Sequence, residues 1–182
     1  MKTSLLAAAL IALSAPFIHA ASDFFLKIDG IKGESSDAVH SETIEVSSWS
    51  WGASNPASTS SGGGTGKVSM QDFHFVCSHD KSSPLLMLAC AQGQHIPKAT
   101  LYVRKQGSDP AGGPVEYLEI TLENILVSSF SSQAPPPVPG GPQAEPTQSI
   151  SLNFTKITSD YAPADGSAHN TAGWDVVANK KI

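Results

Sequence analysis

The chain has 182 residues, of which 40% are hydrophobic and 15% are charged, and its formal net charge is −5 at pH 7. A chain of this length and hydrophobic content can bury one sizeable core, so we expect a single domain. Mildly acidic chains without clusters of Lys and Arg bind phosphate backbones poorly, so we expect no nucleic-acid partner.

The N-terminal residues 1–20 have the pattern of a secretory signal peptide. Lys2 supplies a positive charge, residues 5–17 form a short apolar run, and residues 18–21 end in small side chains typical of a cleavage site. The run is shorter than the about 20 apolar residues that a membrane-spanning helix needs. We therefore expect residues 1–20 to direct export, and residues 21–182 to form one folded domain without membrane insertion. The alternative is a cytosolic chain whose N-terminus is apolar by chance.

Alternation of apolar and polar residues predicts the first two strands. In residues 23–29 the apolar side chains at every second position share one face. In the next strand Ile44 and Val46 point inward, whereas Trp49 and Trp51 have the opposite parity. One extra residue between Val46 and Trp49 would reconcile the two pairs, so we expect a β-bulge or a sharp twist there.

Residues 52–66 are expected to form a long flexible loop, because they include three consecutive glycines, Gly62, Gly63 and Gly64. The stretch does not fit a phosphate-binding loop, because Ser61 stands where the motif has its first glycine. A residue other than Ser or Thr also follows the lysine. Loops of this length inside a compact domain are usually functional or disordered.

Residues 66–99 predict a strand, a short apolar helix and a further strand. Ser83 suits the N-cap, Pro84 suits the first helical position, and Gly93 suits the end of the helix. Nearly every position between Pro84 and Gly93 is apolar. A helix that is apolar on all sides must be covered on all sides, by its own sheet and by a second subunit, so the pattern is a first indication of assembly.

Strand patterns continue to the C-terminus, separated by turns rich in Gly, Asp and Pro. The predicted strands are 99–104, 115–123, 126–130, 150–154 and the closing segment 174–177, and 126–130 is expected to continue from 115–123 after a bend at Glu123 and Asn124. Residues 107–114 are expected to be a turn, and the proline-rich residues 135–142 cannot join a ladder and are expected to be a surface loop. Seven or eight strands with one helix indicate a β-barrel or two packed sheets.

Side chains that could hold a metal or perform catalysis do not form a recognised pattern. The candidate metal ligands are His74, Cys77, His79, Cys90 and His95. His74 and Cys77 lie three apart on a strand and face opposite sides, and no compact zinc spacing is present, so we expect no metal. No G-x-S-x-G motif is present, and Glu116 and Glu119 face opposite sides of a strand. We expect no cofactor and no enzymatic activity.

Three further residues leave alternatives open. In an oxidising compartment Cys77 and Cys90 could pair, but two separately buried thiols fit the sequence equally well. The run that begins at Asn153 matches a glycosylation acceptor, but it lies within a strand pattern.

Several segments, taken together and in order, resemble the haemolysin-coregulated protein (Hcp) family, which forms the tube of bacterial type VI secretion systems. The matching segments are 25–35, 44–52 with its Trp49-Ser50-Trp51-Gly52, 66–75, 80–91, 95–105, 116–129, 151–154 and 173–175. They extend over residues 23–182. A match distributed in this way is specific, although no single segment of it is.

The resemblance implies a mainly β fold, with two packed antiparallel sheets forming a β-barrel and one short α-helix alongside. It also implies a homohexameric ring, stacking of rings into a tube, and a lumen that carries effector proteins, with other type VI secretion components as partners. Ser50 would then face the lumen as a candidate cargo contact, or it is simply a small residue that lets strands pack. Trp49 and Trp51 are expected to be packing anchors.

The same resemblance assigns candidate contacts between subunits and between rings. These are Gly62, Gly63 and Gly64 in the extended loop, and Leu85 and Leu88 on the helix. Two features depart from the family pattern, namely the signal-like N-terminus and a long proline-rich loop at 135–146. The alternative function is therefore an exported, Hcp-like binding module of the periplasm or the extracellular space that does not act as a working tube.

Overall fold

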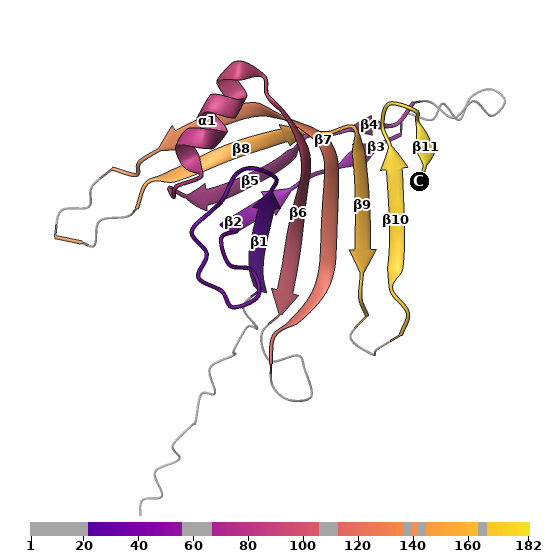
Figure 1. Ribbon diagram of the computed structural model, residues 1–182, viewed down its shortest axis with the longest axis horizontal. Helices are drawn as coiled ribbons and strands as arrows, with labels where there is room; N and C mark the ends of the chain where they lie inside the picture. Colours follow the sequence, from indigo (N-terminus) through magenta and orange to yellow (C-terminus); the bar gives the residue numbers. More distant parts are fainter. Residues whose placement is uncertain (1–21, 56–66, 106–112, 137–139, 142–144, 164–166) are drawn as a thin grey trace, which may run out of the picture.

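The computed structural model describes residues 22–55, 67–105, 113–136, 140–141, 145–163 and 167–182 (Figure 1). Several predictions fall outside the described residues: the signal peptide at 1–20, the three glycines Gly62, Gly63 and Gly64, and most of the turn at 107–114.

The fold is a closed antiparallel barrel, extended on one side by further strands (Figure 1). In order around the barrel, its strands are β1 (Ser22–Ile28), β2 (Ile44–Ser50), β5 (Phe73–Ser78), β8 (Thr147–Asn153), β7 (Val115–Gln133) and β6 (His95–Lys105), which pairs with β1. Strands β9 (Lys156–Tyr161), β10 (Asn170–Asp175) and β11 (Lys180–Lys181) continue the sheet from β7, while β3 (Ala53–Ser54) and β4 (Ser69–Met70) form a separate arm. The predicted β-barrel with one short helix alongside is confirmed.

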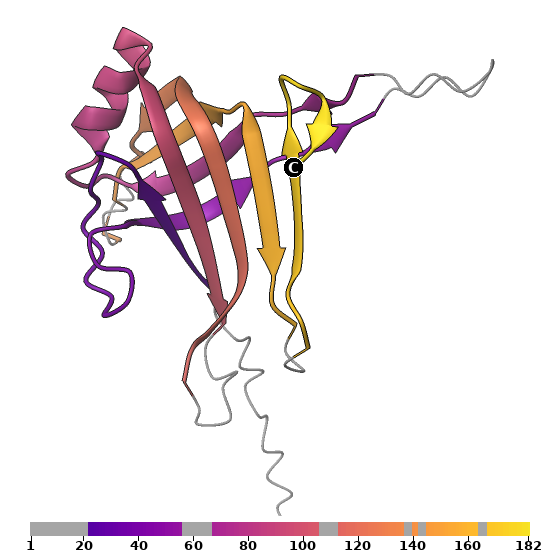
Figure 2. The ribbon, with the colours of Figure 1, turned by 45° about the vertical axis from the view of Figure 1, so that its right-hand side comes forward.

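The barrel has two facing sides, because β2, β5 and β8 cross behind β6 and β7 (Figures 1 and 2). Strand β7 belongs to both sides, since its first half pairs with β6 and β9 and its second half pairs with β8. The segments predicted at 115–123 and 126–130 form a single strand, which continues through the expected bend at Asn124, whose φ of 51° is a conformation that Asn tolerates. Strand β9 was not predicted.

The inward face of the barrel is a continuous apolar core. The predicted bulge in β2 is confirmed, because the register against β5 shifts between Val46 and Ser48. As a result Trp49 turns inward beside Phe73, with its ring centroid 6.0 Å from that of Phe73. Phe73 is fully buried. Burial of a side chain of this kind contributes about 1.5–3 kcal/mol, so the alternating positions supply the main stabilisation of the barrel.

Helix α1 (Ser83–Gln92) packs against β7; its C-terminus is capped by backbone hydrogen bonds, whereas its N-cap residue makes no side-chain cap hydrogen bond. The N-cap is Ser82 rather than the predicted Ser83; the Ser83 hydroxyl instead accepts a hydrogen bond from the Asp80 N–H at 3.0 Å. Gly93 ends the helix as predicted, with a φ of 60° that suits glycine. Within the described ranges, no helix is long and apolar enough to cross a membrane.

Candidate functional site

The outward side of the second half of the barrel carries two rows of side chains, six of which are serines and the other two a histidine and a valine. Cross-strand register aligns them over β2, β5, β8 and the second half of β7. The first row is Ser50, His74, Ser151 and Ser129, and the second row is Ser48, Val76, Ser149 and Ser131. We call these residues the serine face. None of them carries a carboxylate, an ammonium or a guanidinium group.

His74 lies at the centre of the serine face and is held by the two neighbouring hydroxyls of β8. Its Nδ1 lies 3.2 Å from Ser151 Oγ and its Nε2 lies 3.2 Å from Ser149 Oγ. Beside it, Asp72 accepts hydrogen bonds from the Ser128 hydroxyl and from the Asn153 amide, the latter at 2.8 Å. These hydrogen bonds satisfy the polar groups at the centre of the surface within one chain.

Ser50 is exposed on the serine face, directly opposite His74 on β5. Its neighbour Trp49 is turned the other way and is half-buried against the core, as is Trp51. The parity argument made from the sequence therefore places Ser50 where a partner can reach it.

The outer side of α1 is apolar and uncovered. Ser83, Leu86 and Ala89 face the barrel, whereas Leu85, Met87 and Leu88 are 44%, 52% and 45% exposed. We call Leu85, Met87 and Leu88 the helix patch. The expectation that the helix is covered on all sides is not met within a single chain. The uncovered side includes the two predicted contact residues, Leu85 and Leu88.

A second apolar surface lies at the base of the β3–β4 arm, where it faces β9 and β10. It is a groove of about 520 Å³, and we call it the arm groove. Its principal lining residues are Trp51, Val68, Met70, Ile157, Ala172 and Trp174. Among the described residues that line it, none is charged. The indole Nε1 of Trp174 is buried and has no hydrogen-bond partner within the described part of the chain.

Comparison with known proteins identifies the family. The family model described as "Type VI secretion system effector, Hcp" matches residues 25–161. The chain belongs to the Hcp family. Protein hcp1 of Pseudomonas aeruginosa is 43% identical to it over 166 residues, which cover 87% of this chain and 98% of that protein. The resemblance inferred from the sequence is therefore confirmed, and the chain is a protein of the type VI secretion system.

Solved Hcp structures have the same fold. The crystal structure of Hcp1 from Salmonella typhimurium superposes with a TM-score of 0.73 at 36% identity, covering 89% of this chain and 99% of that one. A type VI secretion system effector from Yersinia pestis superposes with a TM-score of 0.67 at 33% identity, covering 84% and 99%. The barrel with one helix alongside is thus shared with Hcp proteins of known structure.

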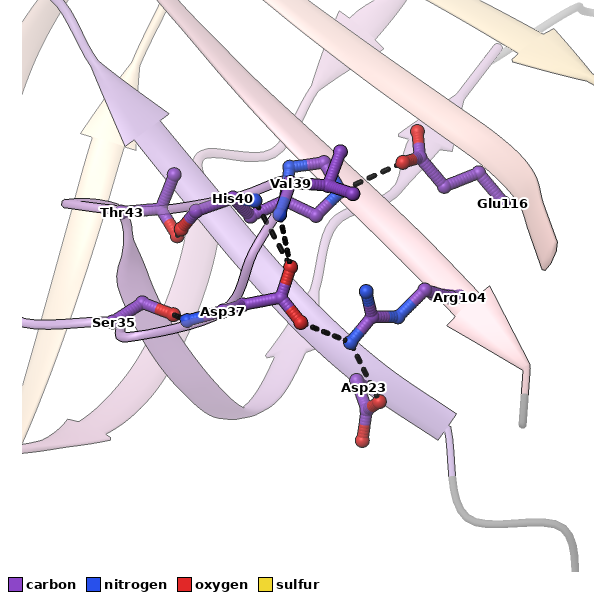
Figure 3. A network of polar contacts seen from close by, with 8 residues as sticks. All are labelled: Asp23, Ser35, Asp37, Val39, His40, Thr43, Arg104 and Glu116. Atoms are coloured by element: carbon purple, nitrogen blue, oxygen red, sulfur yellow. Dashed lines mark hydrogen bonds and ion pairs between the residues drawn. The ribbon is translucent and has the colours of Figure 1, made fainter. Parts of the chain in front are cut away.

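This Hcp barrel also contains a partly buried ion-pair network, centred on Arg104, that the sequence did not indicate (Figure 3). The guanidinium of Arg104 lies 2.7 Å from the Asp37 carboxylate and 3.2 Å from that of Asp23. Hydrogen bonds from Arg104, and from the backbone N–H groups of His40 and Val39, hold the pKa of Asp37 far below its usual range. The bond to Asp37 raises the pKa of Arg104 in turn.

The network attaches the loop 29–43 to the barrel wall through a stacked histidine. The buried His40 ring lies between Phe25 and Tyr102, with centroid distances of 4.8 Å and 4.6 Å. Its Nε2 lies 2.7 Å from Glu116 Oε1 (Figure 3). These contacts join residues distant in sequence, and their partners are provided by the same chain, so we assign the network to stability rather than to ligand binding.

The remaining candidates from the sequence do not come together. Cys77 and Cys90 are free thiols in the structure. Cys77 is fully buried, and burial raises the pKa of its thiol to about 11. The Asn153 amide is bonded to Asp72 within the sheet, which disfavours its use as a glycosylation acceptor. In the described part of the chain, no three His, Cys, Asp or Glu side chains are grouped to hold a metal.

Proposed function

We propose that this Hcp-family chain forms a homohexameric ring whose lumen is lined by the serine face, and that such rings stack into a tube that carries effector proteins. The observation that supports the lumen assignment is the serine face itself. Other type VI secretion components would then be partners of the ring. This function requires neither a catalytic group nor a cofactor, and we expect no turnover of ester, phosphate or glycoside substrates.

The chemistry of the serine face suits a surface that holds polypeptides weakly. Hydroxyl groups both donate and accept hydrogen bonds, so they match backbone and side-chain groups of many sequences. The eight residues of the serine face carry no carboxylate, ammonium or guanidinium group and so do not select cargo by charge, while the Asp72 carboxylate beside them is held by Ser128 and Asn153. In this proposal Ser50 is a cargo contact, because it is exposed in the first row beside His74.

Ring assembly would explain the uncovered helix patch. In a closed ring each copy contacts its neighbour through two different surfaces, so an apolar patch on one flank is buried without a matching patch on itself. Leu85 and Leu88 are therefore proposed as contacts within the ring. Gly62, Gly63 and Gly64, which lie outside the described residues, are proposed as contacts between stacked rings.

A second candidate function follows from the signal pattern in residues 1–20. A chain exported by the general pathway would reach the periplasm before a tube forms, and it could act there or in the medium as an Hcp-like binding module. We propose export and secretion with removal of residues 1–20 in either case. The two functions differ in assembly and in where the hexamer is found.

The test is the mass of the native protein in solution, measured by light scattering on material from cytoplasm, periplasm and medium. A hexamer is the expected result, and intact mass spectrometry then shows whether residues 1–20 are present. A processed hexamer supports ring assembly after export, whereas an unprocessed hexamer confined to the cytoplasm makes the signal peptide prediction wrong. A processed monomer overturns the ring and favours the binding module.

A further inference from the structure

His74 is the one titratable side chain of the serine face. The other residues of that surface are serines and a valine, which do not change charge between about pH 5 and pH 8, whereas histidine ordinarily gains a proton in this range. The His74 side chain is half-buried, with Ser50 opposite it on β2 and with Ser149 and Ser151 beside it on β8. The charge of the serine face is therefore set by His74 alone.

The two serines of β8 can hold the imidazole in either protonation state. Nδ1 of His74 lies 3.2 Å from Ser151 Oγ, and Nε2 lies 3.2 Å from Ser149 Oγ. A neutral imidazole donates one hydrogen bond and accepts another, so one hydroxyl accepts from the ring and the other donates to it. An imidazolium donates from both nitrogens, and the hydroxyl that had donated only needs to rotate in order to accept. Proton uptake therefore requires no movement of the ring or of the strands.

The strands around His74 supply no charged partner for an imidazolium. Strand β8 and the part of β7 from Asn124 to Gln133 contain no charged residue, and β2 contains only Glu45. Glu45 is distant, because the residue that follows it is opposite Cys77, three positions or about 10 Å along β5 from His74. Cys77, the other titratable residue of β5, is fully buried on the opposite side of the strand.

Three titratable side chains lie near the ends of these strands. Asp72 is two residues from the imidazole in sequence, but its two carboxylate oxygens accept hydrogen bonds from Ser128 and Asn153. No ion pair joins Asp72 to the imidazole in the part of the chain that the structure describes. His79 follows β5 and His95 begins β6; both are exposed, and a proton on either adds charge of the same sign. A proton on the imidazole therefore adds a positive charge that is left for water or a bound partner to solvate.

From these observations we propose that His74 is a specificity-determining residue of the cargo surface, through which the serine face selects acidic polypeptides at low pH. The serine face is indifferent to cargo charge only while the imidazole is neutral. With an imidazolium in each copy, the same surface attracts carboxylates, and it releases them when the pH rises.

The inference rests on the proposed lumen, because a ring brings the His74 side chains of all its copies around one cargo. An acidic segment can then contact several imidazolium groups at once, and the weak attractions add. One such charge per copy is far less than the clustered Lys and Arg that a phosphate backbone requires. The expected partner is therefore a polypeptide and not a nucleic acid.

The experiment measures peptide binding to the full chain at about pH 5.5 and about pH 7.5, on either side of the ordinary histidine pKa. The probe is a fluorescent peptide of alternating Asp and Ser, followed by fluorescence anisotropy, and the matched probe has Asn in place of Asp. Aspartate stays ionised at both pH values, since its ordinary pKa is about 3.9. Light scattering gives the native mass of the same samples at each pH.

We expect the Asp peptide to bind at least about five-fold more tightly at the lower pH, and the Asn peptide to bind equally at both. High salt should remove the gain, because attraction between exposed charges is screened. His74→Gln should abolish the gain, since glutamine keeps a donor and an acceptor for the two hydroxyls but cannot take up a proton. The matched control is His169→Gln, which removes an exposed histidine beside Asp160, away from the serine face, and should retain the gain.

The native mass separates failure of this inference from failure of the proposed ring. A hexamer whose affinity for the Asp peptide does not change with pH, or changes equally in His74→Gln, would overturn this inference and leave the ring intact. An equal change for the Asn peptide would also overturn it, because the response would then not depend on cargo charge. A monomer at both pH values would overturn the proposed ring itself.

Discussion

In the Arg104 network the charged groups find their partners within one chain, whereas the apolar side chains of the helix patch remain uncovered in a single chain. Arg104 has two carboxylate partners and the face of Phe25, 4.7 Å from its guanidinium, so its charge is paired within the chain that carries it, while its buried Nε has no hydrogen-bond partner among the described residues. Leu85, Met87 and Leu88 instead remain about half exposed. The difference separates residues that stabilise the subunit from residues that assemble it, and substitutions in the two regions should have different consequences.

The largest expected effect is on assembly, from Leu88→Arg. The side chain is 45% exposed in a single chain, so an arginine there can reach water and the subunit should still fold. In the assembled ring the same charge would be buried without a partner, which is strongly unfavourable. We expect light scattering to show a folded monomer in place of the hexamer.

A matched control for this substitution is Ser131→Arg, which introduces the same charge at an exposed position of the serine face. It should retain the mass of the hexamer. If Leu88→Arg also retains that mass, the helix patch is not a subunit contact. If circular dichroism shows that Leu88→Arg unfolds the chain, then Leu88 stabilises the subunit and is wrongly assigned to its assembly.

The next effect is on the stability of the subunit, from Asp37→Asn. The amide keeps the shape of the carboxylate but removes one of the two charges that face Arg104, so we expect a loss of about 1–3 kcal/mol in the free energy of unfolding. Urea unfolding at pH 7 measures it, in the Leu88→Arg background so that assembly does not contribute. Glu42→Gln, which breaks the exposed pair with Lys32, is the control and should cost much less.

The difference in unfolding free energy between the Asp37→Asn variant and its parent should also depend on pH. The folded-state pKa of Asp37 lies below the ordinary value of 3.8, so its stabilisation is fully present above that value and is lost as the pH falls toward the folded-state pKa. We expect the difference in unfolding free energy to be constant from pH 7 to about pH 5 and to narrow below about pH 4. If the difference in unfolding free energy widens on acidification, the ionised Asp37 carboxylate is not the group that stabilises the subunit.

Much of the barrel could be predicted because its signals are local. The parity change between Val46 and Trp49 predicted a bulge or a sharp twist, of which the structure contains the bulge, and Gly93 marked the end of the helix. Strand β9 was missed because Ile157 is its only buried residue, too little for an alternating pattern. The segments 115–123 and 126–130 were predicted as two strands joined by a bend because Asn124 resembles a turn residue; in the structure it bends one strand that is held by partners on both sides.

The surfaces outside the serine face had no comparable local signal. Ser50 followed from strand parity, but the arm groove joins residues around β3 and β4 with residues of β9 and β10, and no local pattern connects these segments. Likewise Asp37 and Arg104 lie 67 residues apart in sequence and meet only because the loop 29–43 folds back over the barrel wall. The helix patch was predictable as apolar, but which of its residues remain exposed could be known only from the folded chain.

The smallest expected effect is that of Ser50→Ala, which tests the serine face as a cargo surface. Loss of one exposed hydroxyl should change the free energy of unfolding by no more than about 0.5 kcal/mol and should leave the hexamer intact. Because the substitution is repeated in every subunit of the ring, even a small loss of hydrogen bonding per copy should reduce the amount of small protein that co-purifies with the ring, measured by quantitative mass spectrometry. Ser36→Ala, at an exposed position of the loop 29–43, should leave that amount unchanged. If Ser50→Ala instead lowers stability and leaves the co-purified protein unchanged, Ser50 is a packing residue, and the cargo surface lies elsewhere on the barrel.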